Sequence, residues 1–177
     1  MNHYSIQLPT KAYLCRYVHT IYGQGNDKKV IIDPNTDFGD LIFTKLSSDI
    51  HCNLSPSEVC LKLSRMPAEI KMQIPFHWFR KLTMKELTPH QVIRINRHLQ
   101  NLFEKDLCEI VFRAHYFLGI DRQVAIECFA HNHGIQLEID ITFEALKKME
   151  YRYRDQHARY QVRKKIVQDL SCKIKAA

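Results

Sequence analysis

The chain has 177 residues but only five glycines and six prolines. Such a low content argues against a disordered or low-complexity chain, because those compositions are typically rich in both residues. Hydrophobic residues make up 45% of the sequence and charged residues 25%, which is ordinary for a globular protein. We expect one domain, or a small domain with a helical extension, with a true hydrophobic core.

Long hydrophobic runs are also lacking. No segment approaches the roughly 20 apolar residues of a membrane span, and the first residues do not follow the pattern of a signal peptide. The six cysteines are scattered, with no Cys-x-x-Cys pair. This pattern favours reduced thiols in a cytosolic protein. We therefore expect a cytoplasmic protein with no membrane partner.

The common catalytic motifs are absent: there is no Gly-x-Ser-x-Gly and no glycine-rich phosphate loop. Tyr151 and Tyr153 alternate with Arg152 and Arg154, which superficially resembles the tyrosine sites of recombinases and relaxases. The chain is short for a recombinase, and the metal cluster of a relaxase is missing. We expect no enzymatic activity and no catalytic residues.

Ten histidines raise the question of a metal site. His131 and His133 lie near Cys128, at the end of a predicted helix. Residues two apart on a helix point to different sides, so these two imidazoles do not readily share an ion. We expect no metal ligands and no cofactor.

Residues 1–86 are predicted to form a small α+β unit with a short antiparallel or mixed sheet. Val59, Leu61 and Leu63 alternate with polar residues, as do Ile70, Met72 and Ile74 beyond a Pro-containing turn, which predicts a β-hairpin. The other expected elements are a strand over 3–8, a helix over 11–22, a strand over 30–32 and a helix over 37–46.

Residues 87–177 are predicted to be helical, so the fold class is α+β. Thr88, Pro89 and Gln91 form a capping box, and helical spacing of apolar residues continues from there to Leu118. At 1.5 Å per residue, such a helix is about 45 Å long.

A second predicted helix runs over 122–133, between Gly119-Ile120-Asp121 and a C-terminal Gly134. Its expected inner side consists of Val124, Ala125, Cys128 and Phe129, with Ile126 and Ala130 nearby. A connection over 135–141 leads to a third helix. The arrangement is helix-turn-helix-like, although its connection is longer than the usual three or four residues.

The third helix, over 142–160, is named the basic helix here. Thr142 is its expected N-cap, and its apolar side consists of Phe143, Leu146, Met149, Tyr153 and Tyr160. Residues 142–177 carry ten Lys and Arg against four acids, a net charge of +6 out of +7 for the whole chain. Charge localised in this way indicates a polyanionic partner, whereas the ordinary alternative is a solvated helix surface.

The chain resembles small helix-turn-helix-like proteins encoded in phages and mobile elements of gut Bacteroidota. The matching segments are Leu8-Pro9, Tyr13-Leu14, Tyr22-Gly23, Ile74-Pro75-Phe76, Ile95-Asn96, residues 141–148 and Tyr151-Arg152-Tyr153-Arg154. The resemblance implies a host-associated cytoplasmic protein and is compatible with DNA binding or regulation.

We therefore expect a DNA-binding protein, a transcriptional regulator of a phage or mobile element, that binds duplex DNA and forms a homodimer. The alternatives are RNA binding and a non-enzymatic module that docks on an acidic protein. Tyr151 and Arg152 are expected to reach base edges. The expected nucleic-acid-binding residues are Lys147, Lys148, Tyr151, Arg152, Arg154, Arg159, Arg163, Lys164 and Lys165.

Overall fold

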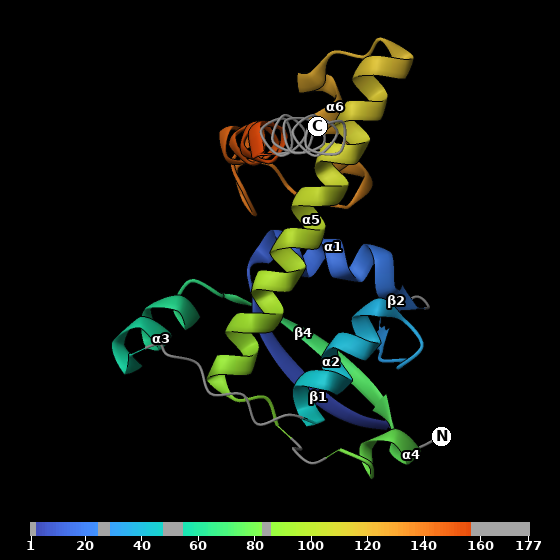
Figure 1. Cartoon of the computed structure of the whole chain (residues 1–177), viewed down its shortest axis with the longest axis vertical. Helices are drawn as coiled ribbons and strands as arrows, with labels where there is room; N and C mark the ends of the chain where they lie inside the picture. The colour runs from blue at the N-terminus through green and yellow to red at the C-terminus, as the bar shows by residue number, and fades with distance from the viewer. Residues whose placement is uncertain (1–2, 25–28, 48–54, 83–85, 157–177) are drawn as a thin grey trace, which may run out of the picture. The chain divides into compact units, whose positions relative to one another are not determined.

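A computed structural model describes residues 3–24, 29–47, 55–82 and 86–156 (Figure 1). The chain divides into two compact units. Unit 1 comprises Met1–Phe103 and Ala130–Ile141, and unit 2 comprises Glu104–Phe129 and Thr142–Ala177. A sheet followed by long helices confirms the predicted α+β class. Within the described residues, no helix is both long and apolar enough to cross a membrane.

Unit 1 contains a mixed four-stranded sheet with the order β1-β4-β3-β2. β1 and β4 pair antiparallel, β3 and β4 pair parallel, and β2 and β3 pair antiparallel. Ile6 lies opposite Met72 and Leu8 opposite Ile70, and all four side chains are buried, whereas the alternate residues of these strands are more exposed. One face of the sheet therefore forms the core. The strands are β1 (His3–Thr10), β2 (Gly23–Gln24), β3 (Lys29–Ile31) and β4 (Ala68–Pro75).

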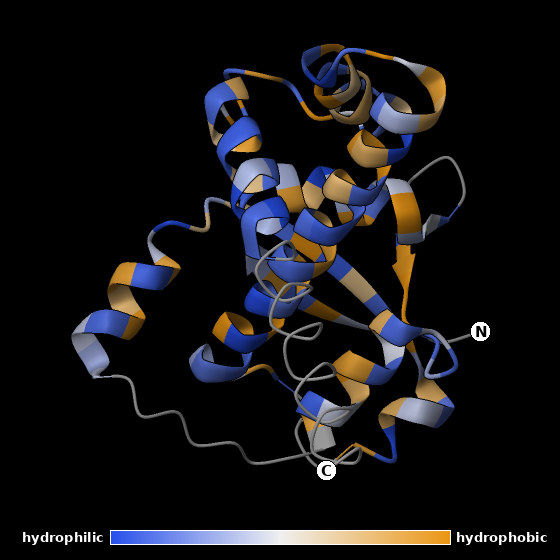
Figure 2. Ribbon diagram, turned by 45° about the horizontal axis from the view of Figure 1, so that its top comes forward, coloured by the Kyte–Doolittle hydropathy of each residue, from blue (hydrophilic) through white to orange (hydrophobic). Residues whose placement is uncertain are grey.

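Helices complete the core of unit 1. Tyr17 is buried between helices, with its ring 5.2 Å from that of Phe103. Hydrophobic and hydrophilic residues are interspersed along the helices, as the hydropathy colouring shows (Figure 2). The helices are α1 (Ala12–Tyr22), α2 (Asp37–Ser47), α3 (Pro56–Leu63), α4 (Phe76–Phe79) and the first part of α5 (Pro89–Leu118).

The predicted hairpin is wrong in its first strand, because residues 56–63 form α3. Ser55 accepts a hydrogen bond from the backbone N–H of Glu58, the Glu58 carboxylate accepts one from the backbone N–H of Ser55, and Pro56 occupies the first turn. This capping box starts a helix, and only Val59 on it is buried. Alternation over five residues was too short a signal to outweigh the cap. β4 instead pairs with β1 and β3.

The start of α5 is fixed as the sequence predicts. Gln91 donates its backbone N–H to the Thr88 hydroxyl, and its side-chain oxygen accepts from the Thr88 backbone N–H. Further along, the amide of Asn96 donates to the Pro9 carbonyl, and its oxygen accepts from the Thr10 hydroxyl. These bonds tie α5 to the end of β1. The first part of α5 thus belongs to the same compact unit as the sheet.

Unit 2 contains the rest of α5, most of α6 (Arg122–Asn132) and the basic helix, described over 143–156. Gly119 adopts a φ of +66° after the end of α5, as its predicted role as a helix stop requires. The predicted inner side of α6 needs correction. Val124 and Cys128 are exposed, whereas Ala125, Ile126, Phe129 and Ala130 are buried, so the buried face is rotated toward Ile126.

Candidate nucleic-acid interface

The basic helix begins where the sequence places it. The backbone N–H of Ala145 donates to the Thr142 hydroxyl, which caps the first turn. Leu146 is fully buried, while Phe143, Met149 and Tyr153 are half-buried, so the predicted apolar side packs within unit 2. The last member of that side, Tyr160, lies outside the described residues.

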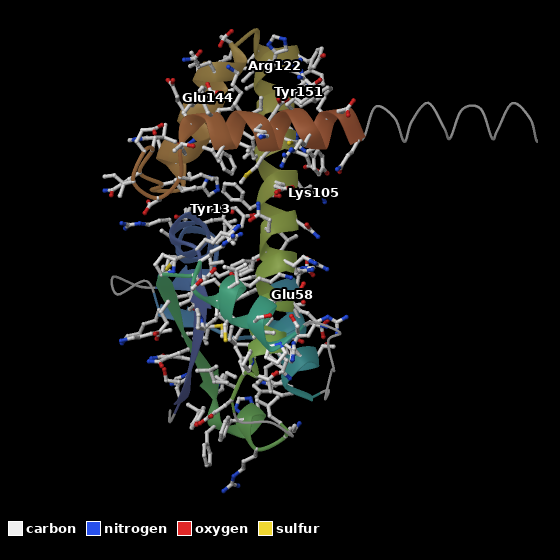
Figure 3. The ribbon with its side chains drawn as sticks, turned by 90° about the vertical axis from the view of Figure 1, so that its left-hand side faces the viewer. Tyr13, Glu58, Lys105, Arg122, Glu144 and Tyr151 are labelled. Atoms are coloured by element: carbon white, nitrogen blue, oxygen red, sulfur yellow. The ribbon has the colours of Figure 1, made fainter. Side chains whose placement is uncertain are left out.

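Four of the predicted contact residues form an exposed face of the basic helix: Lys147, Lys148, Tyr151 and Arg152. Lys148 and Arg152 lie one helical turn apart and therefore project from the same side. In the described part of the chain, neither forms an ion pair. Tyr151 is 59% exposed and stands between them along the sequence (Figure 3). We call Lys147, Lys148, Tyr151 and Arg152 the cationic face.

The other cations of this helix differ in their surroundings. Lys147 Nζ lies 3.6 Å from a carboxylate oxygen of Glu144, in an exposed pair. Arg154 is half-buried, with its Nε 3.8 Å from a Glu150 carboxylate oxygen and its guanidinium carbon 5.4 Å from the centre of the Tyr151 ring. The charge of Arg154 is thus partly balanced within unit 2. The predicted contacts at Arg159, Arg163, Lys164 and Lys165 lie outside the described residues.

A hollow of about 540 Å³ adjoins the cationic face on the side of α6. We call it the basic hollow. Arg122 and Gln123 from the start of α6 line it together with Lys147, Lys148 and Tyr151. Arg122 is not among the residues that the sequence predicts for the site. The sequence indicates its role only weakly, because Arg122 is a single cation in the first turn of α6. The hydrophobic pattern of this helix also predicted the wrong buried face.

Two buried groups lie at the inner side of the basic helix. Glu150 is only 8% exposed, and burial raises the pKa of its carboxyl group, while nearby Arg122 and His115 act in the opposite direction. The Cys108 Sγ lies 3.8 Å from the Glu150 carbonyl oxygen, to which it donates. Burial, together with the charges of Glu150 and Glu104, raises the pKa of Cys108 to about 12. This thiol stays protonated at neutral pH.

The histidines considered as metal ligands have other surroundings. His133 packs on Tyr17, with the ring centres 5.3 Å apart, and its carbonyl accepts a hydrogen bond from Thr20. His131 and Cys128 are exposed. Over the described ranges, no group of three or more His, Cys, Asp or Glu side chains is arranged to hold a metal ion.

The connection between α6 and the basic helix is more structured than a simple turn. It contains a parallel bridge between Leu137 and Ile141, and the Asp140 carboxylate lies 3.5 Å from Arg16 Nε of α1. A compact helix-turn-helix does not have such a connection. Both helices nevertheless contribute cations to the basic hollow in unit 2: Arg122 comes from α6, and Lys147, Lys148 and Arg154 come from the basic helix.

No protein-family model matches the chain, and neither a curated protein nor a solved structure shows significant similarity to it. The resemblance to proteins of phages and mobile elements therefore stays a prediction.

Proposed function

We propose that this chain is a DNA-binding protein that contacts duplex DNA through the cationic face. The observation that carries the proposal is the pair Lys148 and Arg152. Both are exposed, lie one turn apart and form no ion pair among the described residues. Cations in this state can contact phosphates without first losing an internal partner. The concentration of the chain's net charge in residues 142–177 supports the same function.

Tyr151 and Arg152 supply donors and an aromatic ring at the centre of the cationic face, where base edges would lie. Transcriptional regulation in a phage or mobile element is the role that the sequence resemblance suggests. Dimerisation belongs to this proposal, because one short helix reads few bases. RNA binding and docking on an acidic protein are the competing functions.

The test is fluorescence anisotropy with a labelled blunt duplex of mixed sequence across a salt series. Lys148→Ala/Arg152→Ala should weaken binding and reduce the log–log salt slope by about 2, because each lost phosphate contact removes about 0.9 from the slope. Lys71→Ala/Arg97→Ala removes two exposed cations of unit 1 and should leave both quantities unchanged. If the two double variants behave alike, binding is a matter of overall charge, and the cationic face is ordinary surface.

A wild-type protein that fails to bind the duplex at low salt contradicts the proposal. In that case the competing functions are separated by a labelled RNA hairpin and by pull-down with a polyglutamate-coated resin, each compared between the same two double variants.

A further inference from the structure

The last turns of α5 expose an unusual number of large apolar side chains. Phe112 is 52% exposed, Tyr116 60%, Phe117 76% and Leu118 71%. Single exposed apolar residues are common on proteins, but a contiguous patch marks a binding surface. Here the rings touch one another: the centre of the Phe112 ring lies 4.5 Å from that of Tyr116 and 6.3 Å from that of Phe117.

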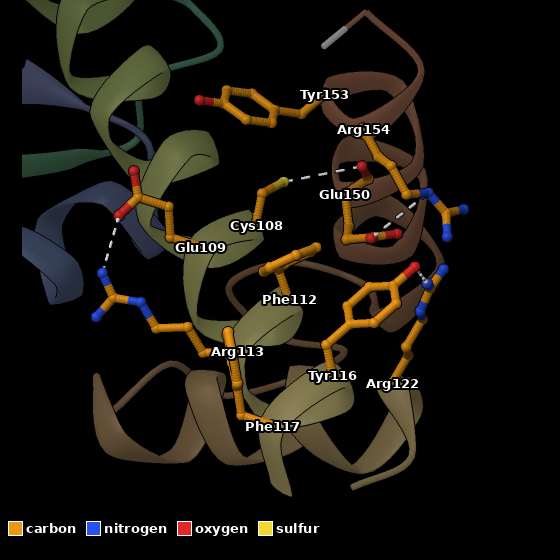
Figure 4. A pocket seen from close by; sticks show the side chains of 10 residues that line it. All are labelled: Cys108, Glu109, Phe112, Arg113, Tyr116, Phe117, Arg122, Glu150, Tyr153 and Arg154. Atoms are coloured by element: carbon orange, nitrogen blue, oxygen red, sulfur yellow. Dashed lines mark hydrogen bonds and ion pairs between the residues drawn. The ribbon is translucent and has the colours of Figure 1, made fainter. Parts of the chain in front are cut away.

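These rings line a groove of about 450 Å³ (Figure 4). We call it the aromatic groove and define it by Phe112, Arg113, Tyr116, Phe117 and Arg122. Such a volume falls within the range of sites that bind small molecules or single chemical groups. The half-buried Tyr153 of the basic helix lines the same groove. Four of the ten described residues that line the groove are thus aromatic, and none is an aliphatic residue.

The charges around the aromatic groove favour an anionic occupant. The carboxylate of Glu109 is balanced by two cations, with Lys105 Nζ and the Arg113 guanidinium each 3.8 Å away. Glu150 is balanced by Arg154. Arg122 donates to the Tyr116 hydroxyl at 3.3 Å and forms no ion pair in the part of the chain that the structure describes, although its charge also acts on the buried carboxyl of Glu150. Because no described carboxylate holds it at ion-pair distance, its guanidinium can still contact an anionic ligand.

The aromatic groove adjoins the basic hollow, because Arg122, Glu150 and Arg154 line both. A ligand with flat apolar groups and a chain of negative charges could therefore place its rings in one and its charges in the other. Arginine–aromatic pairs lie on this path, with the Arg122 guanidinium carbon 5.8 Å from the centre of the Tyr116 ring. Unpaired nucleotides have this combination of properties, since bases stack on aromatic rings while phosphates follow a cationic track.

We propose that the aromatic groove binds unpaired nucleotides of a nucleic-acid strand whose phosphates contact Arg122 and the cationic face. A paired duplex hides its base faces by stacking, so only a single strand, flap or loop could use the rings of Phe112, Tyr116 and Phe117. This inference rests on the proposed function, because the same cationic face holds the phosphates. It adds a preference for strands with unpaired bases.

The test measures anisotropy with three labelled probes of equal length: oligodeoxythymidylate, oligouridylate and a blunt duplex. Phe112→Leu/Phe117→Leu keeps apolar volume at two exposed positions and removes both rings. Its single-strand affinity should fall at least about tenfold, because each stacked base contributes strongly, while duplex affinity stays within about twofold. Phe76→Leu, at an exposed ring of unit 1, should change neither. The tighter of the two single strands shows whether the natural strand is DNA or RNA.

The outcomes separate the two proposals. If the wild type binds the duplex but not the single strands, or if the ring variant binds single strands like the wild type, the groove inference is overturned while the proposed function stands. If the ring variant weakens duplex and single strand equally, the groove inference is also overturned. If no probe binds, both fail. Sedimentation of the ring variant gives a further outcome: loss of self-association with unchanged single-strand affinity would make the groove a contact between two copies and overturn the inference.

Discussion

The Nε atom of Arg154 lies 3.8 Å from the carboxylate of Glu150, a side chain that is 8% exposed. A cation held in this way must give up part of an existing interaction before it can contact a phosphate. Arg152, two residues earlier, is exposed and has no such partner among the described residues. The two arginines therefore differ in their surroundings, although the sequence makes them look equivalent.

Replacing these arginines one at a time tests that difference. Arg152→Ala should weaken duplex binding several-fold and lower the salt slope by about 1, whereas Arg154→Ala should have a smaller effect on both. Anisotropy at two salt concentrations measures each quantity, and circular dichroism checks that both variants remain helical. An equal or larger loss from Arg154→Ala would show that the Glu150 pair does not withhold its charge.

The buried carboxyl of Glu150 should make stability depend on pH. Its folded pKa is raised above the value in the unfolded chain, so between those two values the folded state binds more protons than the unfolded state. Stability contributed by this group is therefore present below the unfolded pKa and is lost as the pH rises through the folded pKa. Glu150→Gln removes this loss, so the variant should gain stability relative to the wild type as the pH rises above the ordinary Glu pKa.

Urea denaturation of both proteins at several pH values measures that difference. Glu144→Gln serves as the control, because Glu144 is exposed and its pair with Lys147 is on the surface. A difference in free energy of unfolding between wild type and Glu150→Gln that stays constant with pH would contradict the prediction.

The Cys108 thiol should resist alkylation in the folded protein. It is buried, and its pKa of about 12 leaves almost no reactive thiolate near neutral pH. Cys60 and Cys128 are exposed free thiols. Brief treatment with iodoacetamide at pH 8, followed by mass spectrometry of peptides, should label Cys60 and Cys128 well before Cys108. Labelling of all three thiols at one rate in native buffer would contradict the prediction.

Asn96 should be important for stability although it is polar. It is buried, and its side chain bonds to the Pro9 carbonyl at 2.8 Å, the Val92 carbonyl at 3.0 Å and the Thr10 hydroxyl. Asn96→Ala leaves buried polar groups without partners, which costs about 1–3 kcal/mol of unfolding free energy. Arg94→Ala, at an exposed position of the same helix, should change it by less than about 0.5 kcal/mol. Chemical denaturation of the two variants compares them directly, and an Asn96→Ala as stable as Arg94→Ala would refute the assignment.

Local signals predicted most element boundaries correctly. The structure contains the Thr88–Gln91 capping box and the Thr142 cap, and Gly119 and Gly134 have the positive φ expected after a helix. These features are predictable because they depend on bonds and backbone angles within a few residues. Where two local signals conflicted, the prediction was wrong. The alternation at Val59, Leu61 and Leu63 predicted a strand, but the Ser55–Glu58 capping box starts a helix there. The short strand at Gly23–Gln24 had no signal of its own, since it exists only by pairing with β3.

The sequence by itself determined the α+β class, the long α5 and the position and composition of the basic helix. It could do so because helical periodicity, caps and charge depend on residues that are close together in the chain. The tertiary structure decided what depends on residues far apart in the chain. It paired Arg154 with a buried Glu150, left Lys148 and Arg152 exposed, turned Val124 and Cys128 outward and joined Phe112, Tyr116 and Phe117 to Arg122 in one groove. Burial is a property of the packed chain. It distinguishes cations and aromatic rings that are chemically alike, because some are held inside unit 2 and others are exposed to a ligand.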